Sequence, residues 1–401
     1  MLGRPGVDLL AGAFFTDGAR DSYRWLRANE PVFHDEANDL WGVASYEGVR
    51  RVGTDAATFS SALGSRPEAG PMPWMIDMDG VDHTRRRRLV SGGFTPARVR
   101  AMAPRVQALC DELIDAVCEV GECDVVADLA APLPLIVIGD LLGVDPADRA
   151  DLLGWTHGML AALTGAPEGF EEAAVAFGAY VAYAHGMIAE RRAAPGDDLV
   201  SLLVHAEVDG EHLSDDDIVF ESLLLLIGGD ETTRQVTSAG VELLVRHPEQ
   251  TATLLADPGR LPGAVEEILR WVSPIKSMAR TTTGPVDLEG VPLPAGANVV
   301  VLYESANFDE RQFDDPERFD IGREPNEHLA FGFGPHVCLG ASLARLEVGS
   351  MLDGILRRLP DLELAEEPPS VRPLTGLERL PVRFAATPSR PPGSPDPPET
   401  P

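Results

Sequence analysis

One cysteine of this chain lies in a glycine-rich loop that leads directly into an expected helix. The loop, residues 331–340, reads FGFGPHVCLG with Cys338 near its end, and the helix is expected over residues 341–358. The positive end of a helix dipole stabilises a thiolate, and glycine lets backbone N–H groups approach a sulfur closely. Such a thiolate can ligate a metal and remain electron-rich. Free cysteines are often simply buried at helix starts, but the ten-residue context favours a ligand.

Two glycines, an acid and a hydroxyl stand together inside a long apolar helix expected over residues 215–246. Residues 228–233 read GGDETT. Glycines in a helix interior cost roughly 1 kcal/mol each relative to alanine, and a helix accepts this where a ligand approaches its backbone or where it bulges. Thr232 could hold a polar ligand atom and Glu231 could relay a proton to it. A helix-crossing point with a satisfied polar pair explains the segment equally well.

Basic residues cluster in an otherwise acidic chain. His83 and Arg87 stand four residues apart in the run HTRRRR, Arg280 opens a strand-like region, and His336 lies two residues before Cys338. A buried ligand carboxylate or another anionic partner is one explanation for this cluster, because arginine pairs well with carboxylates. A solvated basic turn is the other, and we favour it for Arg85, Arg86 and Arg88.

Glu267 and Arg270 stand three residues apart in an expected helix, so their side chains share one face. An exposed pair of this kind stabilises a protein by only about 0–1 kcal/mol. Most such pairs have no further role.

The elements that position these residues are mostly helical. Apolar periodicity and helix-end signals predict helices over residues 20–27, 104–120, 171–192, 215–246, 262–271 and 341–358. Strand-like residues 31–34 and the alternation over residues 279–303 predict small sheets, while residues 65–79 form an irregular loop. The fold class is therefore mainly α with small β-sheets. Without an internal repeat or linker, we expect one catalytic domain, residues 1–386, and a disordered Pro-rich tail, residues 387–401.

Composition narrows the classes of function. The 401 residues carry a net charge of −31, which argues against nucleic-acid binding. Four cysteines are too few and too unevenly placed for a disulfide framework, and we expect Cys110, Cys118 and Cys123 to be structural or incidental. The longest apolar candidate for a membrane span, residues 131–144, is interrupted by prolines and an aspartate, and no signal segment is visible. We expect a cytoplasmic protein.

Together these segments resemble the cytochrome P450 superfamily, from about residue 7 to residue 386. The cysteine loop, the GGDETT helix and the EILR segment at 267–270 occur in the order and spacing of that family. The resemblance implies a P450 fold with haem b between the long central helix and the helix after the cysteine loop. It also implies an enzyme: a haem-thiolate monooxygenase that hydroxylates an unactivated C–H bond.

The resemblance assigns roles to individual residues. Cys338 would be the proximal thiolate ligand, with Phe331 and Gly340 beside it in the haem-binding loop. Glu231 and Thr232 would be the acid–alcohol pair that delivers protons during oxygen activation. Glu267 and Arg270 would lock the core beneath the haem loop, with either Arg318 or Arg323 as a third member. The two haem propionates would pair with His83, Arg87, Arg280 and His336.

A closer resemblance concerns the substrate. Residues 74–79, 121–124, 227–234 and 304–310 look like those of actinobacterial steroid oxidases, which oxidise the terminal methyl (C26/C27) of cholesterol and cholest-4-en-3-one. Another apolar substrate, such as a polyketide or terpenoid, stays open. A haem-thiolate binding protein without turnover would not need the Glu231–Thr232 pair. We expect the apolar pocket to be lined by Met72, Trp74, Met75, Leu223, Ile227, Gly228, Ile275, Met278 and Leu377.

The chain has no flavin or iron–sulfur domain of its own. The resemblance implies that electrons come from a ferredoxin and its NAD(P)H-dependent reductase. A basic surface could attract an acidic ferredoxin despite the negative net charge. The residues expected for this surface are Arg85, Arg86, Arg88, Arg98, Arg100 and Arg345.

Overall fold

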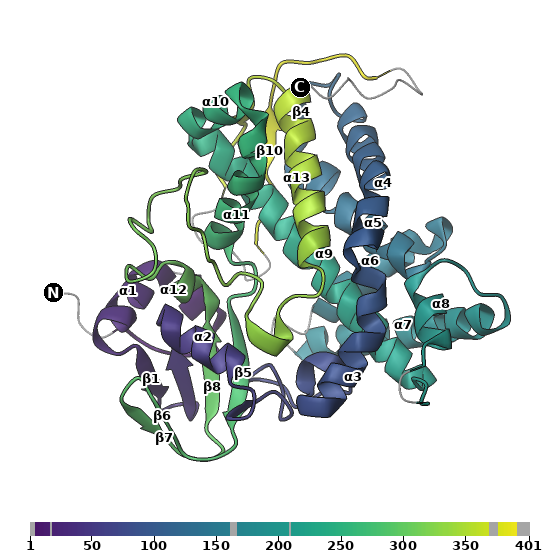
Figure 1. The fold of residues 1–401 in the computed structure, drawn as a ribbon. Helices are drawn as coiled ribbons and strands as arrows, with labels where there is room; N and C mark the ends of the chain where they lie inside the picture. Colours follow the sequence, from purple (N-terminus) through teal and green to yellow (C-terminus); the bar gives the residue numbers. More distant parts are fainter. Residues whose placement is uncertain (1–4, 17, 161–166, 208–209, 369–375, 391–401) are drawn as a thin grey trace.

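Helices dominate the computed structural model, which describes residues 5–16, 18–160, 167–207, 210–368 and 376–390 (Figure 1). The helices are α1 (Ala19–Asn29), α2 (Tyr46–Thr54), α3 (Gly80–Ser91), α4 (Pro96–Asp115), α5 (Pro132–Leu142), α6 (Arg149–Leu160), α7 (Pro167–Ala193), α8 (Leu199–His205), α9 (Asp215–Arg246), α10 (Pro248–Ala256), α11 (Leu261–Val272), α12 (Tyr303–Asn307) and α13 (Ala341–Arg358). This confirms the predicted fold class, mainly α with small sheets.

Within the described residues the strands form three small sheets, and the largest lies at one end of the molecule, away from most helices (Figure 1). Its order is β1 (Val32–Asp35), β2 (Leu40–Val43), β8 (Asn298–Leu302), β5 (Ser277–Thr282) and β3 (Phe59–Ser60). Strands β2 and β8 are parallel, with Leu40 opposite Asn298, so the sheet joins two distant parts of the chain. The other sheets comprise β4 (Glu122–Asp124), β10 (Pro381–Arg383) and β9 (Glu363–Leu364), and β6 (Val286–Leu288) with β7 (Val291–Leu293).

The two helices most important for the site begin where local sequence signals place them. Ser214 caps α9 through a capping box: its hydroxyl accepts from the Asp217 N–H, and the Asp217 carboxylate accepts from the Ser214 N–H. Helix α13 occupies the predicted residues 341–358. The prediction for α4 was wrong, because this helix begins at Pro96 after the Thr95 cap and carries Pro104 in its interior. Proline is also common at the first position of a helix, which made Pro104 resemble a start.

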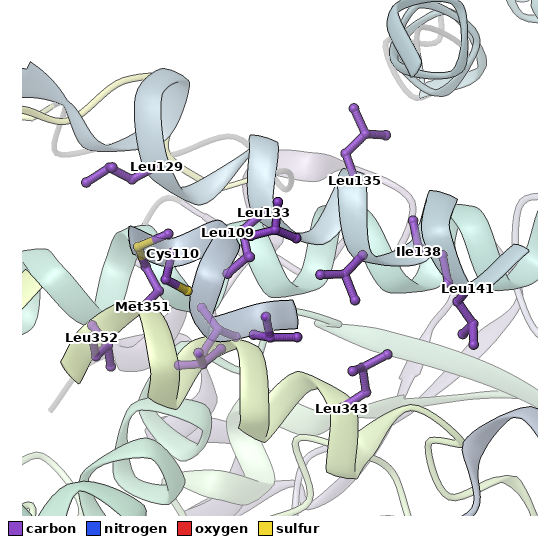
Figure 2. Close-up of a cluster of buried hydrophobic side chains, with 14 of the residues drawn as sticks. Leu109, Cys110, Leu129, Leu133, Leu135, Ile138, Leu141, Leu343, Met351 and Leu352 are labelled. Atoms are coloured by element: carbon purple, nitrogen blue, oxygen red, sulfur yellow. The ribbon is translucent and has the colours of Figure 1, made fainter. Parts of the chain in front are cut away.

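Side chains of α4, α5, α9 and α13 form the main hydrophobic core. Figure 2 shows Leu109 and Cys110 of α4 near Met351 and Leu352 of α13. Cys110 is fully buried, and burial raises the pKa of its thiol. The described helical stretch Val125–Leu142 is apolar enough to cross a membrane, with a hydropathy of 2.0, but 67% of it is buried inside the protein. It therefore has the burial of a core helix.

The first residues of the Pro-rich tail make specific contacts. The Thr387 N–H donates to the Cys118 carbonyl oxygen at 2.9 Å. Ser389 bonds to Glu119, and the Arg390 guanidinium donates to Asp111 at 2.6 Å. Order therefore extends beyond residue 386 to Arg390, while residues 391–401 lie outside the described ranges.

Candidate active site

The cysteine loop depends on glycines at two tight places. Gly332 and Gly334 have φ values of +68° and +74°, in the left-handed region that favours glycine. A Cβ on Gly334 would lie 2.2 Å from the Gly53 carbonyl oxygen, so the loop packs directly on the backbone of α2. The Cys338 N–H donates to the Phe331 carbonyl oxygen at 2.8 Å and closes the loop. Cys338 is thereby held three residues before α13 begins.

Competing effects act on the Cys338 thiol. The residue is exposed, but the protein atoms packed around its sulfur desolvate it and raise the pKa of the thiol. The Gly340 N–H bonds to the sulfur, and this bond and the positive charges of Arg87 and Arg345 act in the opposite direction. Arg345 also lies over the Phe331 ring at 4.5 Å and pairs with Glu266. Phe331 thus holds the Arg345 cation beside the thiol. The Gly340 N–H and the two arginines suit a cysteine that binds a metal as a thiolate.

Helix α9 presents an open patch of backbone at Gly228. A Cβ built on Gly228 would meet nothing within 4 Å, whereas one on Gly229 would contact Ile138 at 3.4 Å. The Thr232 hydroxyl donates to the Gly228 carbonyl oxygen at 2.7 Å. Helix α9 continues through both glycines. The space beside Gly228 therefore comes from its missing side chain and not from a break in the helix. The hydroxyl oxygen of Thr232 keeps its lone pairs for a further partner.

The Glu231 side chain has other bonding partners than its neighbour Thr232. Its carboxylate pairs with Arg234, whose Nε lies 3.1 Å from Glu231 Oε2. Arg234 also donates to the Leu377 carbonyl oxygen at 3.0 Å. Within the described part of the chain no hydrogen bond joins Glu231 to Thr232. The predicted acid–alcohol pair is therefore adjacent in sequence, but its two side chains bond to different partners.

The four predicted propionate partners gather from three separate segments. The rings of His83 on α3 and His336 in the cysteine loop lie 4.1 Å apart between centroids. Arg87, one turn after His83, donates to the Val337 carbonyl oxygen at 2.5 Å. Arg280 on β5 is 5% exposed, and its guanidinium lowers the pKa of both imidazoles. The structure thus brings these basic residues together beside the cysteine loop.

This basic cluster has more cationic groups than anionic partners. Burial is the first cause that lowers the pKa of His83 and of His336, the latter to about 3, and the arginines lower both further. Asp79 opposes this effect, with its Oδ1 3.9 Å from His336 Nε2. His83 Nε2 is buried without a hydrogen-bond partner, and Arg280 has no ion-pair partner, among the described residues. The cluster therefore fits a ligand with carboxylate groups, such as haem.

Comparison with known proteins agrees with this geometry. A model of the cytochrome P450 family matches residues 261–382. The chain is 51% identical to a steroid C26-monooxygenase of Mycolicibacterium smegmatis, with 98% of each chain covered. A steroid C26-monooxygenase of Mycobacterium tuberculosis is also 51% identical, with 96% of this chain and 98% of that protein covered. The chain belongs to the cytochrome P450 family.

Solved P450 structures share the whole fold. CYP109E1 of Bacillus megaterium in complex with testosterone superposes with a TM-score of 0.84 at 34% sequence identity. The match covers 91% of this P450 and 99% of that chain. The P450 fold expected from the resemblance is therefore confirmed, and the family implies haem as the cofactor.

The structure selects Arg323 as the third member of the lock in this P450. Glu267 and Arg270 are both fully buried, with two N–O distances of 2.8 Å between them. The Arg323 Nε lies 3.1 Å from Glu267 Oε2. Arg318 instead pairs with Asp320 and is mostly exposed. Arg270 also donates to the Asn307 and Pro316 carbonyl oxygens, so the lock ties α11 to the segment before the cysteine loop.

The predicted pocket residues differ in how buried they are. Gly228 is exposed, Ile227 is half-buried, and Leu223 is 3% exposed, all on α9. Met75, Leu223 and Leu377 belong to the main core, where Trp74 and Ile227 also pack, whereas Ile275 and Met278 pack on the sheet cluster. A hollow of about 480 Å³ between α6 and α7 contains none of the predicted pocket residues. The substrate lining thus stays a prediction.

Ion pairs occupy most of the arginines expected to receive a ferredoxin. Arg85 pairs with Glu211, and Arg86 with Asp217 near the start of α9. Arg98 pairs with Asp197, and Arg345 pairs with Glu266 on α11. Arg88 and Arg100 are exposed. Four of the six arginines therefore have acidic partners, and these partners lie in several separate segments, which weakens the hypothesis of a single basic surface.

Sequence reasoning missed several acidic residues of this P450. Asp77 accepts hydrogen bonds from the Ser65 N–H, the Met72 N–H and the Trp74 indole N–H, each at 2.8–2.9 Å. Asp230 and Glu221 are buried in α9, and Glu347 is buried in α13. An acid in an apolar helix is rarely buried without a partner. This signal was present in the sequence of α9.

Proposed function

We propose that this P450 hydroxylates an unactivated C–H bond of a steroid, with the terminal methyl (C26/C27) of the side chain of cholesterol or cholest-4-en-3-one as the preferred position. The supporting observation is the 51% identity, over nearly the full length of both chains, to steroid C26-monooxygenases. An aliphatic side chain also suits the apolar residues of the expected pocket.

Haem b would be held from two sides. The Cys338 thiolate would bind the iron, and His83, Arg87, Arg280 and His336 would bind the two carboxylates. When bound, haem with a thiolate ligand supplies oxygen activation, because the thiolate favours O–O cleavage. The Gly340 N–H and the start of α13 stabilise the negative sulfur. Phe331 would pack beside the bound group, with the Arg345 guanidinium over its ring.

Thr232 and Glu231 of α9 would deliver the protons. The Thr232 hydroxyl is anchored on the Gly228 carbonyl oxygen and faces the open patch of α9, where it can accept a hydrogen bond from water. Glu231 would be the proton source, and Arg234 fixes its position between turnovers. Because no direct bond joins the two side chains in the described structure, protons would pass from Glu231 to Thr232 Oγ1 through water or after rotation of Glu231.

The overall reaction would convert R–H, O2, two electrons and two protons into R–OH and water. We assign the electrons to a ferredoxin with an NAD(P)H-dependent reductase, since the sequence contains no flavin or iron–sulfur motif. This division of labour, with the cofactor performing the oxygen chemistry, is general for haem oxygenases. We place the enzyme in the cytoplasm.

A spin-state titration tests the proposal. Adding cholest-4-en-3-one to the haem-loaded protein should displace water from the haem pocket and shift the absorption spectrum of the haem. A Cys338→Ser variant controls for the ligand, since it should lose the thiolate-type spectrum of the reduced, CO-bound protein. No shift at saturating steroid, with a clear response to a macrolide or terpenoid, would replace the steroid with another natural product.

A further inference from the structure

A wholly buried carboxylate, Glu221, lies on the same face of α9 as Gly228. Glu221 is 0% exposed, although it belongs to the first third of this long helix. Seven residues separate it from Gly228, so the two share a helix face and lie about 10 Å apart along the axis. Burying a charged group costs free energy unless it is paired and hydrogen-bonded. A carboxylate at this position therefore needs an explanation.

Two groups from outside α9 meet the Glu221 carboxylate. The Met75 N–H donates to Glu221 Oε1 at 2.8 Å in a buried hydrogen bond. Arg86 Nη1 lies 3.5 Å from the same oxygen, and Arg86 Nη2 lies 2.7 Å from Asp217 Oδ1, one turn earlier on α9. We call Glu221, Met75 and Arg86 the clasp. The clasp joins α9 to the loop before α3 and to α3 itself.

Hydrogen bonds within residues 65–77, the loop that the clasp holds, fix the shape of this loop. Asp77 accepts the N–H groups of Ser65 and Met72 and the Trp74 indole N–H. These contacts fix the shape of residues 65–77, but all of them lie within the loop. The Met75 N–H is the backbone group through which α9 sets the position of this shaped loop. Met75 itself is 6% exposed and belongs to the main core.

Arg86 connects the clasp to the basic cluster beside the cysteine loop. Arg86 stands on α3 next to Arg87 and three residues after His83. Glu221 Oε2 and Arg86 Nη1 are buried and have no hydrogen-bond partner within the described ranges. The hydrogen bond to Met75 is therefore the best-formed contact of the carboxylate. Burial raises the pKa of Glu221 to about 7, and Arg86 opposes this shift.

We propose that Glu221 is a positioning residue that fixes the loop carrying Met72, Trp74 and Met75 against the Gly228 face of α9, and so determines which substrate carbon is oxidised. The part that concerns substrate rests on the proposed steroid hydroxylation. A loop held at one distance from α9 limits how deeply an apolar chain enters. Release of the loop would let the chain bind in several registers, and several carbons would then be oxidised.

Two substitutions separate the hydrogen bond from simple burial. Glu221→Gln keeps a carbonyl oxygen that can accept the Met75 N–H, whereas Glu221→Leu keeps volume but removes the acceptor. Glu211→Gln removes an acid that pairs with the neighbouring Arg85 on the exposed side, and it is the control. The CO spectrum and the unfolding midpoint of each haem-loaded variant establish that it is folded. If Glu221→Leu does not load haem, Glu221→Ala replaces it, because it removes the same acceptor with a smaller side chain.

Hydrogen–deuterium exchange of the substrate-free holoenzyme tests the attachment of the loop. The peptide containing Met75 should exchange about 5–10-fold faster in Glu221→Leu, from loss of one hydrogen bond of about 1 kcal/mol. Exchange in Glu221→Gln and in Glu211→Gln should match the wild type. Wild-type exchange in Glu221→Leu would overturn the proposal, whatever the substrate is. Glu221→Ala, if it replaces Glu221→Leu, is judged by the same two outcomes.

Product distribution tests the consequence. With cholest-4-en-3-one, Glu221→Leu should give a mixture of hydroxylated carbons, and Glu221→Gln should restore a single product. Unchanged regioselectivity in a variant with a released loop would contradict the positioning role. If the wild type does not bind steroid, the proposed function fails. The exchange result then still decides whether the clasp holds the loop, and the spread of products from any accepted apolar substrate decides its role.

Discussion

The imidazole rings of His83 and His336 lie 4.1 Å apart between centroids, although 253 residues separate them in the sequence. Arg280 and Arg87 lower the pKa of both rings, after burial. This contact joins α3 to the cysteine loop, and Arg280 of β5 lies close enough to act on both rings. The cluster explains why a carboxylate-bearing cofactor would stabilise the junction between the sheet end and the helical part of the molecule.

Arg280→Met should weaken haem retention. Arg280 is buried and its only assigned role is to bind a haem carboxylate, and a hydrogen bond to a charged group contributes about 1.5–3 kcal/mol. We expect the haem-loaded variant to lose haem roughly 10–100-fold faster to an excess of apomyoglobin. Arg88→Met, an exposed residue of α3, is the control and should release haem at the wild-type rate. Equal rates for both variants would remove Arg280 from the cofactor site.

Thr232→Ala should uncouple electron use from product formation. The variant lacks the hydroxyl that donates to the Gly228 carbonyl oxygen. Proton delivery during oxygen activation would therefore be impaired. We expect NAD(P)H consumption to continue with several-fold less hydroxylated product and with release of peroxide. Thr232→Ser keeps the hydroxyl and should restore coupling. Full coupling in Thr232→Ala would exclude the hydroxyl from proton delivery.

Arg323→Met should destabilise the fold far more than Arg318→Met. Loss of Arg323 leaves the buried Glu267 carboxylate with fewer partners, and breaking a buried ion pair costs about 3–5 kcal/mol. Arg318 makes an exposed pair with Asp320, which contributes about 0–1 kcal/mol. The measurement is the urea midpoint of haem-loaded protein. Similar midpoints for the two variants would show that Arg323 is not part of the lock.

Asp230→Asn should change how stability depends on pH. Burial raises the pKa of Asp230 to about 7, Glu231 adds to this, and Arg234 opposes it. In the unfolded chain the carboxyl ionises near pH 4, so the wild type loses stability as pH rises from about 4 to 7. The variant has no such penalty. We expect its advantage over wild type to grow by roughly 2–3 kcal/mol between pH 5 and pH 8.

Chemical unfolding at the two pH values measures this difference. Asp151→Asn, at an exposed position of α6, should follow the wild type at both pH values. A constant difference between Asp230→Asn and wild type would show that Asp230 stays ionised when buried.

Local signals in the sequence predicted helix ends well where a cap was present. Ser214 and Asp217 correctly predicted the start of α9, and the glycines of the cysteine loop predicted the start of α13. Pro104 misled the prediction for α4 because a proline inside a helix resembles a proline at its start. Strand β2, paired in parallel with β8, could not be predicted, because this pairing depends on residues about 260 positions apart.

The site followed a similar division. Family resemblance identified Cys338 and the four basic residues, which the structure gathers in one place. No spacing rule could separate Arg323 from Arg318, since only the folded chain shows which of them reaches Glu267. The ion pair between Glu231 and Arg234 could not be predicted either, because a spacing of three residues in a helix permits this contact without requiring it.

Product identification with cholest-4-en-3-one tests the central claim most directly. Haem-loaded enzyme, a ferredoxin and its reductase are incubated with this steroid, NAD(P)H and O2, and the products are identified by mass spectrometry and NMR. We predict one oxygen atom from O2 at the terminal methyl of the side chain, and no product from Cys338→Ser. A wild-type enzyme that loads haem, consumes electrons and leaves the steroid side chain unoxidised would contradict the account.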